Sequence, residues 1–404
     1  MKLKLWKFAT RDSLVYGSIL VASLFKIAYA WSRPIFFSGP DANGFIPGAE
    51  DFAQKSFWSA EIVSQPQYPA GYPYLLSIFV RIFGSHWIQA AQLFQILAFG
   101  VMSFFCYKFY LKLFGSVNAI AASGYLFLST AWYVATGAAM YESLFLSSLL
   151  FSVIGIHALF IEKKMKHWSL PFIVGFFVGL TIFIHARAIP IFVVIFLIVL
   201  MRTRRFDLNI ILVTLAALPL PLIFAYRNFI AVGKFTLTFP GVWAAATWNE
   251  FIAQCNSISC VIDRAQANPL GFIKQSLINS AEFWSPHSGS LERGSWFHNI
   301  SLLAQLEKRG FISFAIIIGL IFSILVFASW AFGTILLLKE RIVFHMELLS
   351  VAMVIWITDI LVYGENRHRL IALIFMLPAH AKTFLVLFDF TKTKIGNEKN
   401  HKMN

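Results

Sequence analysis

The sequence predicts an all-α protein that crosses a membrane about ten times. Hydrophobic residues make up 58% of the 404 residues, only 13% are charged, and the mean hydropathy is +0.72. A soluble chain of this length could not cover so much apolar surface, so lipid must be the solvent for most of it. Lys and Arg also cluster at the ends of the hydrophobic runs, which is typical of multi-pass membrane proteins.

The hydrophobic runs can be assigned to about ten helices. The first run follows a basic start, is too long for a signal peptide and lacks a small-residue cleavage site, so we expect it to be an anchor. The run that opens at Pro190 is the shortest. The expected spans cover about residues 13–31, 87–107, 117–135, 143–161, 168–184, 189–201, 208–226, 311–338, 342–363 and 370–388.

The basic clusters predict the orientation of the chain. Strict alternation of the spans places these clusters on one side, so both termini are expected in the cytoplasm. We therefore expect one membrane-embedded domain over residues 1–388, in the cell inner (cytoplasmic) membrane, with a cytoplasmic tail at 389–404. Its large outward loops would be the first one, residues 32–86, and the long segment between the seventh and eighth spans, residues 227–310.

Acidic residues on the outward side are the first candidates for chemistry. Asp41 follows Gly39-Pro40, a turn signal near the end of the first span. Glu142 opens the fourth span, where a carboxylate also interacts favourably with the helix dipole, so structural and functional roles both stay open. Glu50 and Asp51 fit the solvated face of an interfacial amphipathic helix.

Arginines on the same side are the second set of candidates. Arg187, Arg367 and Arg369 lie in two short outward turns that break the usual charge rule. Arg227 and Lys234 are the other cationic candidates on this side. An arginine at membrane depth needs an anion, because burying it unpaired is costly. That anion is either one of the carboxylates or the phosphate of a lipid-borne substrate, which the planar guanidinium matches well.

Several classes of function are disfavoured. The net charge of +14 is explained by the basic span ends, so nucleic acid is not an expected partner. No Walker loop, HExxH or Rossmann glycine fingerprint is present, so neither ATP nor a dinucleotide is implied. No cofactor is expected to be obligatory and no metal ligands are assigned, although the outward carboxylates leave a divalent metal open.

The three cysteines carry less information. Cys255 and Cys260 flank four residues in the outward segment, and a disulfide between them stays an open alternative to two free thiols. Cys106 lies within a span and is expected to be an inert packed thiol.

The order of several short motifs resembles the GT-C superfamily of integral-membrane glycosyltransferases. The resemblance is to bacterial members related to protein mannosyltransferases and the lipid A aminoarabinose transferase. The motifs are PDANGFIPGAEDFA, QYPAGYPYLLSIFVRIFG, YESLFLSSLLF, HARAIP, AYRNFIAVGKFTLT and ENRHRLIALIFMLP. Two positions depart from the family pattern, because Phe45 and His368 each stand where the family commonly has Tyr.

The resemblance implies transfer of a hexosyl or pentosyl group from a polyprenyl-phosphate donor at the outer membrane face. The acceptor would be a lipid, a glycan or a protein, and a single displacement would invert the anomeric centre. Asp41 would be the general base, Glu142 a second acidic residue, and Arg367 and Arg369 the holders of the donor phosphate. The expected substrate-binding set also includes Arg187, Arg227 and Tyr72.

Three other functions remain as alternatives. A polymerase or ligase of lipid-linked glycans would share the spans and the arginines, but would not need an acidic first loop. A transporter would need polar groups near the midplane, where Lys26, Asp359 and Lys382 are too few to define a path. A non-catalytic scaffold of the same fold is the third, and the departures at Phe45 and His368 keep it open.

Overall fold

Every regular element that the structure describes is a helix. The computed structural model describes residues 2–32, 42–59, 71–128, 139, 141–162, 167–204, 207–233, 235–237, 258–284, 312–340, 343–362 and 366–401. Within these residues, five helical stretches are long and apolar enough to cross a membrane. They are Asp12–Tyr29, Gly71–Gly124, Glu142–Glu162, Leu208–Ala231 and Ile371–Phe388. The class of polytopic helical membrane protein is therefore confirmed, whereas ten crossings remain a prediction.

Four α-helices are described in the N-terminal third of the chain. They are α1 (Lys2–Ser32), α2 (Ala42–Gln54), α3 (Gly71–Phe83) and α4 (Trp87–Leu128), and a short 3₁₀ turn, η3 (Gly84–His86), precedes α4. Inside α4, Gly115 has φ 80° and ψ 179°, a non-helical conformation that suits glycine. This break falls between the two spans that the sequence predicts in the region.

Helix α2 replaces much of the expected first loop with a packed element. Phe45, Ala49 and Phe52 are spaced by one helical turn and are all buried, while Glu50 is exposed. This agrees with an amphipathic helix, although the helix begins earlier than the acidic stretch that suggested it.

The central helices follow the predicted spans closely. They are α6 (Glu142–Ile156), the π-helical segment η4 (His157–Glu162), α7 (Leu170–Ile184), α8 (Ala188–Thr203), α9 (Leu208–Ala217) and α10 (Pro219–Val232). The span expected at 208–226 is divided at Leu218, directly before Pro219-Leu220-Pro221. A proline inside a helix removes a backbone hydrogen bond, which accounts for the division.

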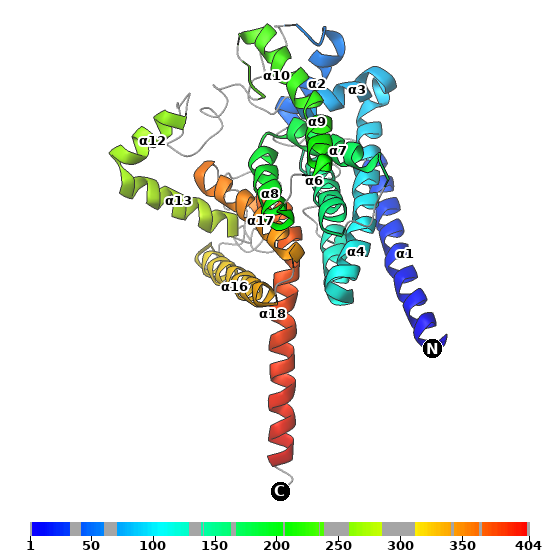
Figure 1. Cartoon of the computed structure of the whole chain (residues 1–404), viewed down its shortest axis with the longest axis vertical. Coiled ribbons are helices and arrows are strands. Elements are labelled where there is room, and N and C mark those ends of the chain that lie inside the picture. The colour runs from blue at the N-terminus through cyan, green and yellow to red at the C-terminus, as the bar shows by residue number, and fades with distance from the viewer. Residues whose placement is uncertain are drawn as a thin grey trace.

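Five helices are described in the C-terminal part of the chain. They are α12 (Ile258–Ala267), α13 (Pro269–Trp284), α16 (Ile312–Lys339), α17 (Val343–Val362) and α18 (Asn366–His401). Helix α13 packs against α16, α17 and α18. Figure 1 shows that α1 lies beside α4. Helices α2, α3 and α10 lie at the upper end of the view, and the C-terminal part of α18 extends from the opposite end.

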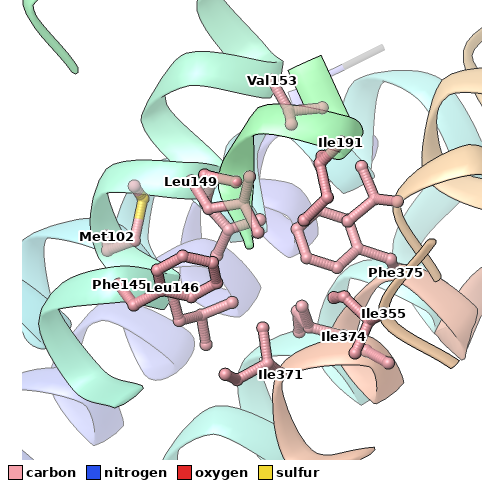
Figure 2. Packing of buried hydrophobic residues seen from close by; sticks show 14 of the residues in the cluster. Met102, Phe145, Leu146, Leu149, Val153, Ile191, Ile355, Ile371, Ile374 and Phe375 are labelled. Carbon is pink, nitrogen blue, oxygen red and sulfur yellow. The ribbon is translucent and has the colours of Figure 1, made fainter. Parts of the chain in front are cut away.

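The core of the molecule lies around α6. Of its fifteen residues, twelve are buried, and it packs against α4, α7 and α18. Figure 2 shows apolar side chains from α6 and neighbouring helices converging there. The labelled ones are Met102 of α4, Phe145, Leu146, Leu149 and Val153 of α6, Ile191 of α8, Ile355 of α17, and Ile371, Ile374 and Phe375 of α18.

Glycines allow the closest approaches between helices. A Cβ on Gly175 or Gly179 of α7 would lie 2.4 or 2.3 Å from the carbonyl oxygens of Val213 and Ala217 of α9. Such small-residue contacts are the usual way in which helices pack inside a lipid bilayer. At Gly71, the first residue of α3, a Cβ would lie 1.8 Å from the carbonyl oxygen of Phe183. The start of α3 is thereby held against the end of α7.

Candidate functional site

The turn between α7 and α8 is the centre of the candidate site. Helix α7 ends where His185 becomes extended, with φ −154° and ψ 122°. The backbone N–H of Arg187 then donates a hydrogen bond to Nδ1 of His185 at 3.1 Å. This bond and the start of α8 at Ala188 fix the His185 ring and the backbone of Arg187 in the HARAIP motif.

Aromatic rings connect this turn to α6, α2 and α3. The His185 ring lies 4.7 Å from that of Tyr141 and 6.0 Å from that of Phe145, measured between centroids. Tyr141 lies 6.3 Å from Phe45, which in turn lies 5.0 Å from Tyr72. Motifs that are far apart in the sequence therefore meet at one end of the bundle.

Glu142 and Tyr72 are brought together at this end. Glu142 is the first residue of α6 and only 2% of its surface is exposed. It directly follows Tyr141, whose ring is connected to that of Tyr72 through Phe45. Tyr72 is fully buried and donates its hydroxyl hydrogen to Oε1 of Gln95 at 2.8 Å. The favourable dipole at the start of α6 stabilises a carboxylate in this apolar setting.

Arg187 forms an ion pair with a residue that sequence reasoning did not assign to the site. Its Nη2 lies 3.2 Å from Oδ1 of Asp359, whose side chain is fully buried in the last turn of α17. The Arg187 side chain is 11% exposed, and its Nη1 has no hydrogen-bond partner within the described part of the chain. An acidic residue inside a span is itself a signal of function, but the sequence does not show which cation it meets.

Arg227 is held by contacts of its own. It is buried, and its Nε and Nη2 donate to the carbonyl oxygens of Phe57 and Ser59, both at 3.0 Å. Its Nη1 donates to Oδ1 of Asn228 at 2.9 Å. These bonds tie α10 to the segment after α2. They favour a structural role, and the expected contact with substrate stays a prediction.

Arg369 also has a protein partner. Its Nη1 donates to the carbonyl oxygen of Trp284, the last residue of α13. The Trp284 ring packs against those of Trp330 and Trp356, at 5.5 and 5.7 Å between centroids. Arg369 thus lies where α13 meets α18, in contact with a different set of helices from Glu142 and Tyr72.

Other predicted residues fall partly or wholly outside the described part. Asp41 and Cys255 lie outside it, as do the side chains of Arg367 and His368. Cys260 is disulfide-bonded, while Cys106 is a buried free thiol. Within the described residues, no group of three or more His, Cys, Asp and Glu side chains could hold a metal ion.

Comparison with protein families matches part of the chain. Residues 67–226 match the family model described as dolichyl-phosphate-mannose-protein mannosyltransferase. The matched segment contains Tyr72, Glu142 and Arg187, ends one residue before Arg227, and begins after Asp41. No curated protein matches the chain.

Proposed function

Because residues 67–226 match the dolichyl-phosphate-mannose-protein mannosyltransferase family, of the GT-C superfamily, we propose that the chain transfers a sugar from a polyprenyl-phosphate donor. The match confirms the GT-C resemblance and indicates a membrane glycosyltransferase. The proposal adds the donor class, an acceptor that is a lipid, glycan or protein, and a site at the outer face of the cytoplasmic membrane.

One observation carries the proposal beyond the family match. A buried carboxylate, Glu142, and a largely buried guanidinium, Arg187, lie at the same end of the bundle, joined through the rings of Tyr141 and His185. Buried charges are costly in a membrane protein and mark functional sites more often than structural ones. A carboxylate and a cation with aromatic rings between them suit a reaction in which a phosphate leaves the anomeric carbon of a sugar.

The chemistry needs no nucleotide. Phosphate is a good leaving group, so a polyprenyl-phosphate sugar is already activated for substitution at its anomeric carbon. The acceptor hydroxyl must lose a proton to a carboxylate, and a cation must balance the charge that develops on the departing phosphate. We assign the general base to Asp41, a supporting acidic role to Glu142, and the phosphate contact to Arg187, Arg367 and Arg369.

The expected stereochemistry follows from a single displacement. The base and the leaving phosphate must lie on opposite faces of the sugar, so the anomeric configuration is inverted. We also assign Tyr72 to the substrate-binding set, because its ring packs on Phe45, which in turn packs on Tyr141 beside the turn between α7 and α8.

The test is a transfer assay with Asp41→Asn. Membranes containing the wild type or the variant, matched for expression, receive labelled polyprenyl-phosphate sugars, and label is followed into lipid, glycan and protein fractions. We expect the wild type to transfer label and Asp41→Asn to lose about 100-fold or more of the rate, as expected when a general base is removed.

The matched control is Asp51→Asn. Asp51 lies in α2 after the same first span, but it forms a partly exposed ion pair with Lys55 at 3.1 Å. Such pairs contribute little, so this variant should retain wild-type transfer. Equal rates for Asp41→Asn and the wild type would remove Asp41 as the base, and no transfer by the wild type from any donor would reject the proposed function.

A further inference from the structure

Asp359 is a buried carboxylate whose position calls for an explanation. It lies in the last turn of α17, where the negative end of the helix dipole disfavours an anion. Its side chain is fully buried and pairs with Arg187 at 3.2 Å. A buried ion pair seldom stabilises a protein more than apolar residues of the same size would, so stability alone is a weak reason for it.

The pair leaves one edge of Arg187 available. Nη2 faces Asp359, while Nη1 is buried and has no hydrogen-bond partner within the described part of the chain. A buried N–H group without a partner is costly, and an anionic oxygen is the acceptor that would satisfy it best. Meanwhile the backbone of Arg187 is fixed by its hydrogen bond to His185.

Holding one edge of a guanidinium, on a backbone that is itself fixed, is a way to prepare it for an anion. The long side chain of arginine has many rotamers, and a site that must order it on binding loses affinity. Asp359 removes that cost by holding one edge of the fork before any ligand arrives. A preorganised cation also stabilises developing charge without reorganising during the reaction.

We propose that Asp359 is a positioning residue that holds Arg187 so that its Nη1 edge contacts the phosphate of the donor. This inference rests on the proposed function and adds to it a residue outside the segment that matches the family model. It also gives α17 a part in the site, through a contact between a helix in that segment and one beyond it.

A double-mutant cycle tests the inference. The variants are Arg187→Gln, Asp359→Asn and the double variant, and the readout is kcat/KM for a labelled polyprenyl-phosphate sugar. If Asp359 acts through Arg187, each single variant should lose about 10-fold or more, the scale of a charge-assisted hydrogen bond. The double variant should then lose no more than Arg187→Gln alone. Additive losses would overturn the inference.

Glu347→Gln is the matched control. Glu347 is also a buried carboxylate of α17, with its Oε2 3.0 Å from Nδ1 of His157. It lies twelve residues before Asp359, which is about 18 Å along a helix. Glu347→Gln should lower the thermal midpoint without changing the KM for the donor. Its effect on kcat/KM should add to that of Arg187→Gln in the double variant.

A charge exchange separates positioning from simple stabilisation. Arg187→Asp combined with Asp359→Arg restores an ion pair but moves the cation from α8 to α17. We expect the exchange to recover the thermal midpoint lost by either single variant, and to leave kcat/KM low. Recovery of both would show that only the pair matters, and would overturn the inference.

A binding assay keeps the two proposals distinguishable. Purified variants are titrated with a short-chain polyprenyl phosphate, which needs no sugar and no acceptor. Weaker binding by about 10-fold in Arg187→Gln and Asp359→Asn, but not in Glu347→Gln, would support the positioning role even if the wild type transferred no sugar. Equal affinities in all variants would reject it, whatever the transfer assay shows.

Discussion

At the scale of single residues, buried arginines divide into two kinds. Arg227 donates to three protein oxygens, two of which are backbone carbonyls, and its guanidinium lies 5.3 Å from the Phe52 ring. Arg187 has one carboxylate partner and an Nη1 edge that no described residue satisfies. The contacts of Arg227 are typical of an arginine that holds two segments of the protein together. Those of Arg187 are typical of an arginine that binds a ligand.

Arg227→Lys tests this distinction. Lysine keeps the charge but cannot reproduce the planar fork, so the carbonyls of Phe57 and Ser59 would lose their donors. We expect a destabilisation of about 1–3 kcal/mol for a buried group left unpaired, seen as a lower thermal midpoint in detergent. The KM for the donor should stay at the wild-type value.

Lys55→Ala serves as the comparison for that experiment. Lys55 pairs with Asp51 at the surface, so its loss should change stability by less than about 1 kcal/mol. A raised KM for Arg227→Lys with an unchanged midpoint would instead identify Arg227 as a substrate contact.

From the sequence we could predict where charged residues lie along the helices, but not which residues they contact. Sequence reasoning located Glu142 at the start of a helix and expected Arg187 to need an anion. It could not choose between a carboxylate and a phosphate, since a single sequence does not show which distant residues meet. Arg227 and Phe57, for example, are 170 positions apart. Whether Asp41 joins the same site stays a prediction.

At the scale of elements, small residues decide how closely helices approach. Gly175 and Gly179 are one helical turn apart on α7, and both face backbone atoms of α9. In lipid there is no hydrophobic driving force between helices, so this close packing is a main source of association.

Leucine at either glycine should separate the two helices. Gly175→Leu and Gly179→Leu are each expected to destabilise the folded protein by about 1–3 kcal/mol, because the added atoms overlap backbone carbonyls. The measurement is the thermal midpoint of the purified protein. Phe176→Leu is the control, because the Phe176 side chain is 48% exposed and the change leaves the contact with α9 intact. A loss of stability in the control as large as in the glycine variants would contradict this account.

The helices that the sequence predicted well are those with long apolar runs. Helices α3 and α13 were missed because each begins with Gly or Pro, residues that usually indicate turns, inside a segment expected to be an outward loop. Yet the sequence Gly71-Tyr72-Pro73 fits the first turn of α3, where proline needs no backbone donor. The bare backbone of Gly71 then permits the contact with Phe183 that positions Tyr72.

At the scale of the whole molecule, the orientation in the membrane remains the main prediction. Fusions of alkaline phosphatase after residues 59 and 284 should be active, because the positive-inside pattern places these points outside the cytoplasm. Fusions after residues 204 and 339 should be inactive, because basic residues precede both points. If the fusions after residues 204 and 339 were active and those after residues 59 and 284 inactive, the orientation would be the reverse of the predicted one. The site would then lie on the cytoplasmic side.

Neighbour relations between helices lay beyond sequence reasoning altogether. Hydropathy identifies the segments that enter lipid, but it is nearly the same on every face of a buried helix such as α6. The packing in Figure 2 therefore had to come from the structure, as did the participation of α17 in the candidate site.

The two ion pairs of α17 also constrain how the protein is made. His157 and Arg187 are synthesised long before Glu347 and Asp359, the carboxylates with which they pair. Until α17 leaves the ribosome and inserts, the nascent bundle must carry these polar side chains without their final partners. A chain that ends before α17 would therefore lack the carboxylate partners of both His157 and Arg187, and its buried polar groups would differ from those of the finished protein.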